Sequence, residues 1–212
     1  RLFISAEAEH LVNVIDPATD KVLKRIPVGP QPNEVAVTPD GRLLYVPSAT
    51  TGMYEVVDVA QGKIITKIKT GGNPHNVVCS ADGKNMYLSP LGDPHKIFIV
   101  ETATHQVVGE IPLGGQARPI ALRGDGRRLF IEYDPLIGFV MAEVPQGKIL
   151  HTVRIELPPD LQNVPSRCHG IGVTPNGNEV WVCDVMHEFV AVFDVTVEPP
   201  KQITRIPTKG QP

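Results

Sequence analysis

The chain has 212 residues, a net charge of −3 and no run of Lys or Arg, which argues against a nucleic-acid partner. Its longest apolar stretches have the length of strands, so none is expected to cross a bilayer as a helix. The 21 prolines and 19 glycines punctuate these stretches, a distribution typical of many short strands joined by turns.

The sequence repeats itself every 42 or 43 residues, with one longer step of 51. Three markers recur in one register. The first marker is an aromatic residue in an alternating strand: Phe3, Tyr45, Tyr87, Phe130 and Trp181. The second is the turn before this strand: Asp40-Gly41, Asp82-Gly83, Asp125-Gly126 and Asn176-Gly177. The third is an acid at the end of the next strand: Asp16, Asp58, Glu101, Glu143 and Asp194. Each acid precedes a turn, where a carboxylate can accept backbone N–H bonds, so we predict a structural role for it.

Each repeat predicts four short antiparallel strands. In the second repeat these are NEVAVTP, RLLYVPS, YEVVDV and IITKIKT, in which apolar residues alternate with period two. The Asp-Gly or Asn-Gly pair supplies the positive φ that a tight hairpin turn needs. We therefore predict an all-β fold, a β-propeller of four-stranded antiparallel blades. The blades are expected at approximately 1–30, 31–72, 73–115, 116–158 and 167–210, with a loop insertion at 158–167.

The phrases VNVIDPATDKVLKRIPVG and VAVTPDGRLLYVPS resemble the YVTN-type β-propeller repeat family of bacterial surface and periplasmic proteins, which is related to lactonase-like and haem-carrying nitrite-reductase propellers. The resemblance covers residues 1–212. It implies a single β-propeller domain in the periplasm or outside the cell, and no signal peptide is visible in the chain. No CxxCH, Walker, GxSxG or HExxH motif is present, so the sequence leaves the cofactor and the catalytic residues unknown.

The two ends of the chain predict open blade edges. The sequence begins at RLFIS, the second strand of a blade, and ends at IPTKGQP, which aligns with IPVGPQP. About five blades are therefore expected, four whole and one without its inner strand. The seven blades usual in the family imply an incomplete chain, and the alternative is a five-bladed ring that lacks its last inner strand. We expect the open edges to pair with flanking blades, a partner chain or other copies.

One polar position varies from blade to blade. Seven residues before the Asp or Asn of each tight turn stand Asn33, His75, Arg118 and His169. Because inner strands line the channel of a propeller, these side chains are predicted to converge at the channel mouth and to suit an anionic or carbonyl-bearing ligand. The alternative is a scaffold ring whose polar groups only satisfy the backbone.

The loops between the second and third strands are expected on the same face. They contribute Asp93, His95, Glu132, Tyr133, Asp134, Asp184, Met186 and His187. Of these, Tyr133 and Asp184 join the ring residues as predicted ligand-binding residues. Hairpin pairing across Asn176-Gly177 is expected to put Asp184 about opposite His169. There it would either fix the tautomer of the imidazole or form a surface salt bridge.

The last repeat has further distinctive features. His169 follows Ile155 by 14 positions where the other blades take seven, and the extra loop either walls a pocket or is a tolerated surface insertion. No metal site is predicted, because no established spacing fits the thiol, imidazole and thioether groups of this repeat (Cys168, His169, Cys183, Met186 and His187). The three cysteines are either buried thiols or one disulfide with one free thiol, the third cysteine being Cys79.

Two functions compete on these observations. The first is an extracytoplasmic binding or scaffold propeller that recognises a small anionic ligand or a protein partner on the channel-mouth face. The second is a lactonase-, lyase- or oxidoreductase-like propeller enzyme that uses His75 and His169 with Arg118. The regularity of the blades and the lack of a complete catalytic constellation favour the first.

Overall fold

The structure of the protein is a computed structural model that describes residues 1–212. Nineteen strands form five antiparallel sheets, and the single helical element is a 3-10 turn, η1 (Glu7–Glu9). The prediction of an all-β fold built from antiparallel sheets is confirmed. The chain divides into two compact units, Arg1–Glu110 and Ile111–Pro212. No helical segment has the length and hydrophobicity that crossing a membrane requires.

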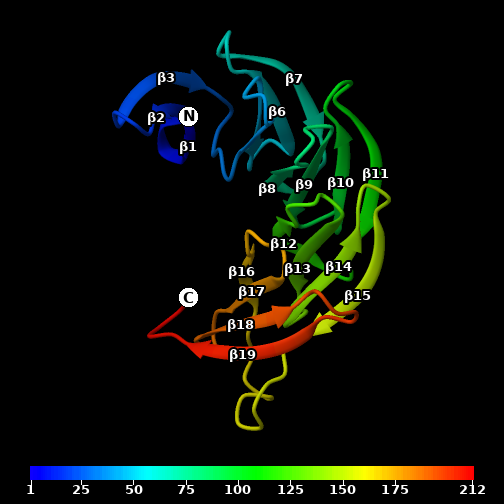
Figure 1. The fold of residues 1–212 in the computed structure, drawn as a ribbon. Coiled ribbons are helices and arrows are strands. Elements are labelled where there is room, and N and C mark those ends of the chain that lie inside the picture. Colours follow the sequence, from blue (N-terminus) through cyan, green and yellow to red (C-terminus); the bar gives the residue numbers. More distant parts are fainter. The chain divides into compact units, whose positions relative to one another are not determined.

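The first unit holds three sheets, each built from strands consecutive in sequence (Figure 1). The first sheet has three strands: β1 (Leu2–Ala6), β2 (Leu11–Asp16) and β3 (Lys21–Pro27). The second has β4 (Ala36–Val37), β5 (Leu43–Ser48), β6 (Met53–Asp58) and β7 (Lys63–Lys69). The third has β8 (Asn73–Cys79), β9 (Asn85–Leu91), β10 (Lys96–Glu101) and β11 (Gln106–Pro112), whose last two residues belong to the second unit.

The second unit repeats this plan twice. Its first sheet has β12 (Gln116–Leu122), β13 (Arg128–Asp134), β14 (Gly138–Glu143) and β15 (Lys148–Arg154). Its second sheet has β16 (Cys168–Val173), β17 (Glu179–Asp184), β18 (Phe189–Asp194) and β19 (Lys201–Pro207). The longer connection from β15 to β16 contains the predicted insertion at 158–167, which forms turns and no strand.

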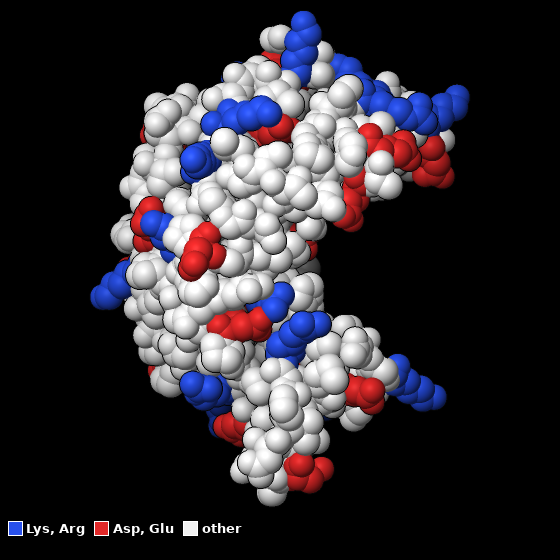
Figure 2. Space-filling model, turned by 180° about the vertical axis from the view of Figure 1, so that it is seen from behind, with Lys and Arg blue, Asp and Glu red and all other residues white.

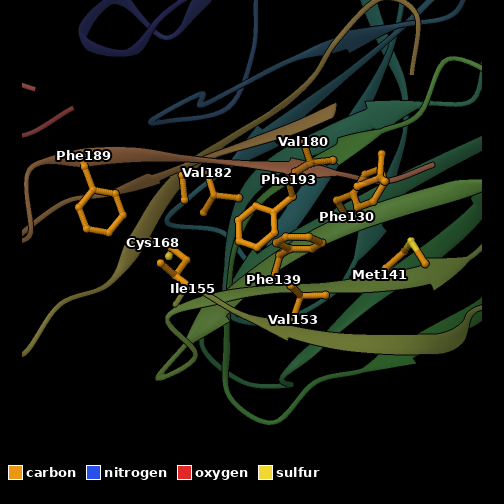
Figure 3. Packing of buried hydrophobic residues seen from close by; sticks show 12 residues of the cluster. Phe130, Phe139, Met141, Val153, Ile155, Cys168, Val180, Val182, Phe189 and Phe193 are labelled. Atoms are coloured by element: carbon orange, nitrogen blue, oxygen red, sulfur yellow. The ribbon is translucent and has the colours of Figure 1, made fainter. Parts of the chain in front are cut away.

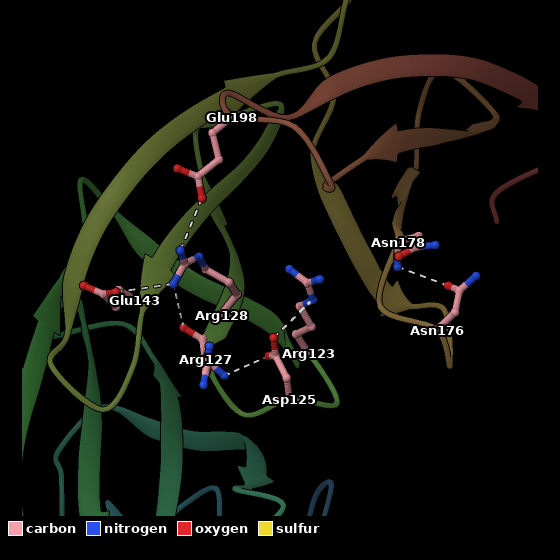
Figure 4. A network of polar contacts seen from close by, with 8 residues as sticks. All are labelled: Arg123, Asp125, Arg127, Arg128, Glu143, Asn176, Asn178 and Glu198. Carbon is pink, nitrogen blue, oxygen red and sulfur yellow. Dashed lines mark hydrogen bonds and ion pairs between the residues drawn. The ribbon is translucent and has the colours of Figure 1, made fainter.

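The predicted tight turns join the first two strands of each four-stranded sheet. Their glycines have φ near +70°, a conformation that glycine adopts without steric cost. The residue before the glycine closes the turn with its side chain. Oδ1 of Asp40, for example, accepts hydrogen bonds from the hydroxyl of Thr38 and the N–H of Arg42. Asn176 accepts from Thr174 and Asn178 in the same way, and its bond to Asn178 is drawn in Figure 4.

The predicted backbone hydrogen bonds of the acids at the ends of the third strands are present for three of the five. The three aspartates accept backbone N–H bonds inside the next turn: Asp16 from Ala18, Asp58 from Gln61 and Asp194 from Thr196. The two glutamates, which are one methylene longer, bind side chains instead. Glu101 accepts from the hydroxyl of Thr104, and Glu143 from the guanidinium of Arg128, which also reaches Glu198 (Figure 4).

Within each unit, the core lies between neighbouring sheets packed face to face. In the second unit the rings of Phe130, Phe139 and Phe193 meet edge to face, with centroids 5.8 and 5.0 Å apart (Figure 3). In the first unit one cluster joins the first and second sheets and another joins the second and third. The repeat aromatic Tyr45 belongs to the second of these clusters. Tyr87 is buried as well, whereas Trp181 in the last sheet is 40% exposed.

Candidate functional site

The four ring residues predicted from the sequence share one structural feature. Each stands where the pairing of the first two strands of its sheet slips by one residue. The slip falls at His75 in β8, at Arg118-Pro119 in β12 and at His169-Gly170 in β16. Asn33 lies between the isolated bridge of Pro32 to Ser48 and the start of β4. Such β-bulges re-aim side chains and are over-represented next to functional sites.

The bulge of β8, in the first unit, is closed by a phenol. The N–H of His75 donates to the hydroxyl of Tyr54 at 3.1 Å, and this hydroxyl donates to the carbonyl of Asn76 at 3.1 Å. Tyr54 is fully buried, and burial raises its pKa, so the phenol stays neutral. Nδ1 of His75 lies 3.2 Å from a carboxylate oxygen of Glu34, the residue after Asn33.

The bulge of β12, in the second unit, carries an ion pair. Nε of Arg118 donates to Oδ2 of Asp134 at 2.8 Å, and the terminal Nη2 donates to the same oxygen. The two side chains are 13% and 28% exposed, so the pair is only partly hydrated. The positive charge predicted to anchor an anion is therefore offset by a carboxylate of the same sheet.

Close backbone packing fixes this ion pair. A Cβ on Gly115 would lie 1.7 Å from the carbonyl oxygen of Asp134, so only glycine fits there. A Cβ on Gly114 would lie 3.2 Å from the ring of Tyr133, which shows that this predicted ligand-binding side chain packs against the preceding loop. Tyr133 is half-buried and pairs with Ala117, next to Arg118.

The bulge of β16 is closed by Glu132 of β13. The N–H of Gly170, next to the exposed His169, donates to Oε2 of Glu132 at 3.0 Å. Glu132 is fully buried, and its other oxygen, Oε1, has no hydrogen-bond partner. Burial raises the pKa of Glu132 to about 8, the Gly170 N–H and Arg118 act in the opposite direction, and Asp134 adds to the increase.

Sequence reasoning placed Glu132 among the loop residues but did not predict it as a site residue. The signal that could have found it is positional. The same place in the other strands, two residues after the repeat aromatic, holds Pro47, Ser89 or Cys183. A glutamate in a strand position otherwise occupied by small or apolar residues predicts a buried charge.

The structure corrects the expectation for Asp184. The bulge shifts the register, so Asp184 stands opposite Cys168 and not opposite His169. The prediction of a surface salt bridge is also wrong, because Asp184 is fully buried. Its Oδ1 accepts a hydrogen bond from Ser166, and its Oδ2 lies 2.8 Å from Nδ1 of His187.

His187 connects the insertion to the loop between β17 and β18. Its Nε2–H donates to the carbonyl of Val164 at 2.9 Å, and its ring stacks on Phe189. The insertion also helps to wall a groove of about 590 Å³ beside β18 and β19, whose lining includes Pro158, Leu161 and Arg205. Of the two alternatives for the extra loop, the structure thus favours a loop that walls a pocket.

The thiols are not activated and do not pair. All three cysteines are free, Cys168 is buried, and Cys79 and Cys183 are half-buried. Burial raises the pKa of each thiol, to about 11 for Cys79. No cluster of three His, Cys, Asp or Glu residues is arranged to hold a metal ion. Acidic and basic side chains are interspersed over the face shown in Figure 2, without a broad area of one sign.

Asn33 and His75 belong to the first unit, and Arg118 and His169 belong to the second. The convergence of all four side chains on one axis therefore stays a prediction. Within each unit, the bulges bring neighbouring sheets into contact. Glu34 in the loop before β4 reaches His75 on β8, and Glu132 on β13 reaches Gly170 on β16.

No family model matches the chain, and a search of the curated proteins finds no match. Among solved structures, the chain is similar to Kuenenia stuttgartiensis hydrazine synthase, with a TM-score of 0.70 over 99% of this chain and 84% of that chain. The sequence identity is 21%, so the likeness concerns the fold alone. Together with the consecutive antiparallel sheets packed face to face, it supports a β-propeller-like all-β fold for this chain.

Proposed function

We propose that the protein is an extracytoplasmic binding propeller of the YVTN-repeat type that recognises a small anionic ligand at its channel mouth. The observation that carries the proposal is a one-residue shift in strand pairing that recurs in four sheets, at a position where the polar residue varies among asparagine, histidine and arginine: Asn33, His75, Arg118 and His169. A scaffold that keeps its backbone and varies one inward position separates stability from recognition.

Arg118 is the proposed anchor for the anion. Its guanidinium is held by Asp134 in a fixed orientation and remains 13% exposed, so a ligand meets a preorganised cation. The same pairing makes Asp134 a competitor, because the ligand must share the donors of Arg118 with this carboxylate. Recognition is therefore selective for ligands whose oxygens match the guanidinium better than Asp134 does.

The side-chain chemistry supports binding over nucleophilic catalysis. The hydroxyl of Ser166 donates to Asp184 and accepts the N–H of Met186, so no imidazole activates it. Both ring nitrogens of His187 are engaged, by Asp184 and by the carbonyl of Val164. The thiols have raised pKa values, which disfavours the reactive thiolate.

The test is calorimetric titration with small carboxylates and phosphates at pH 7. We expect Arg118→Leu to weaken anion binding at least about tenfold and Asp134→Asn to strengthen it, because the first removes the anchor and the second removes its competitor. Arg127→Leu is the matched control, since Arg127 is an exposed arginine at the tight turn between β12 and β13. Unchanged binding in Arg118→Leu, or loss of binding in Arg127→Leu, contradicts the proposal.

A second candidate function, a lyase- or lactonase-like enzyme, is favoured by one observation. A buried carboxyl whose pKa is raised to about 8 is the kind of group that acts as a general acid near neutral pH. In that case Glu132 would act beside Arg118 and His169, with His75 holding the substrate. Turnover of a lactone or a hydroxy acid that Glu132→Gln abolishes would favour the enzyme over the binding protein.

We further propose that the five sheets belong to a ring of seven blades. In β3, β7 and β15 the sixth residue (Ile26, Ile68 and Val153) is buried in a core shared with the next sheet. The same place in β19 holds Ile206, which is 40% exposed. An apolar position that is buried in its other copies suits a further blade packed on β19. A closed five-bladed monomer, measured by sedimentation together with small-angle scattering, would rule this out.

A further inference from the structure

Glu132 on β13 stands apart from the other buried carboxylates of the molecule. Glu55 and Asp184 are equally buried, but each has a partner for both of its oxygens, either an ion pair or a hydrogen bond. Oε1 of Glu132 has none. A buried polar atom without a partner costs stability, so such atoms are rare and call for an explanation. Here the contrast points to a partner that is not part of the chain.

We propose that Oε1 of Glu132 donates a hydrogen bond to the carboxylate of a small molecule bound at the bulge of β16, an inference that rests on the proposed anion-binding function. The geometry around the carboxyl group assigns the roles of its two oxygens. Oε2 accepts the N–H of Gly170 and so acts as the carbonyl oxygen, which leaves the proton of the neutral acid on Oε1.

The surroundings of Glu132 keep it neutral at pH 7. Burial is the main cause and raises its pKa to about 8, against the opposing effects of the Gly170 N–H and Arg118. Asp134 raises it further. The other titratable groups near it are the thiols of Cys168 and Cys183, whose own pKa values are raised by burial and by Glu132. A carboxylic acid kept neutral in this way is a strong hydrogen-bond donor to an oxygen anion.

The charge balance of the site selects a carboxylate over a phosphate. The nearby cation, Arg118, is already paired with Asp134, so the site tolerates little added negative charge. A ligand carboxylate brings one charge, which it shares with the proton of Glu132. A phosphate dianion would bring two. Arg118 and Asp134 are partly exposed whereas Glu132 is fully buried, so the ion pair is the solvent-accessible part of the proposed site and Glu132 its buried part.

The experiment follows Glu132 directly. Protein labelled with ¹³C at its glutamate carboxyls is titrated from pH 6 to 10 with and without acetate or succinate, and the Glu132 signal is assigned by its loss in Glu132→Gln. We expect both carboxylates to raise the midpoint of the Glu132 titration, and their affinity to fall about tenfold per pH unit above the unliganded midpoint. Acetamide, the neutral isostere of acetate, serves as the control and should leave the midpoint unshifted.

Two variants separate donation of a hydrogen bond from a merely structural role. Glu132→Gln keeps an N–H donor and should bind carboxylates at pH 7 with no dependence on pH, whereas Glu132→Leu should not bind them. Carboxylates that leave the Glu132 signal unchanged, or a pH dependence that persists in Glu132→Gln, overturn the inference. If binding then still falls in Arg118→Leu, the proposed function stands without it; binding that is indifferent to Arg118→Leu overturns the proposed function itself.

Discussion

The bulges of β8 and β16 set the same backbone problem and solve it with different side chains. In the first unit the hydroxyl of Tyr54 accepts one N–H and donates to one carbonyl, so every group is satisfied by a neutral residue. In the second unit Glu132 accepts one N–H and leaves Oε1 without a partner. A bulge of this fold can thus be closed by a neutral side chain at a lower cost in folding free energy than by Glu132. This difference teaches that the requirements of the scaffold do not account for the glutamate.

The largest expected effect comes from removing the ionisable group at the second bulge. Glu132 has a folded pKa of about 8 against an ordinary value of 4.5, so its contribution to stability is fully present below pH 4.5 and is lost as the pH rises towards 8. Glu132→Gln avoids this loss. We expect the variant to be more stable by roughly 3–5 kcal/mol at pH 9 and to differ little in this respect at pH 4.5.

Urea unfolding followed by fluorescence measures this effect in the correct unit, because Trp181 is the single tryptophan of the chain and belongs to the second unit. The curves should be recorded at pH 5, 7 and 9. A stability difference that does not grow with pH would show that Glu132 is ionised in the folded protein, and the contrast with Tyr54 would lose its basis.

The same acid-to-amide change should have the opposite sign at Asp184. This carboxylate is as buried as Glu132, but its oxygens are engaged by Ser166 and His187. Asp184→Asn removes the charged partner of a buried imidazole, and we expect a loss of roughly 2–3 kcal/mol at pH 7. Urea unfolding followed by Trp181 fluorescence measures this loss in the same way as for Glu132→Gln, so the two free energies can be compared. A stabilised Asp184→Asn variant would mean that hydrogen-bond partners do not distinguish the two acids.

Replacing the phenol tests the other half of the comparison. Tyr54→Phe keeps the ring but leaves the N–H of His75 and the carbonyl of Asn76 without their shared partner. We expect a loss of about 2 kcal/mol. It should be constant from pH 5 to 9, because burial raises the pKa of the phenol and keeps it neutral. Faster hydrogen exchange of the His75 amide locates the effect, and unaltered exchange there would contradict the assignment.

The sequence allowed the local part of the structure to be predicted. The Asp-Gly and Asn-Gly turns and the period-two strands depend on neighbouring residues, and Gly41 and Gly177 have the expected positive φ. The place of Asp184 was missed because a bulge shifts the register by one residue, and turn spacing carries no signal for that shift. The hydrogen bond between Glu132 and Gly170 was missed because the two residues lie 38 positions apart on different sheets. Contacts between sheets depend on packing, which one sequence does not reveal.

The smallest expected effect concerns a carboxylate at the edge of a blade. Oδ1 of Asp58 accepts the N–H of Gln61 at 2.8 Å in the turn after β6, at an exposed site where water can replace a lost partner. Asp58→Ala should therefore lower the free energy of unfolding by only about 1 kcal/mol and leave ligand binding unchanged. Circular dichroism during urea unfolding, combined with the acetate titration at pH 7, measures both quantities. Lost ligand binding with unchanged stability would place a binding site at the turns after the third strands. It would contradict the proposal that these turns only stabilise the fold while the bulges bind the ligand.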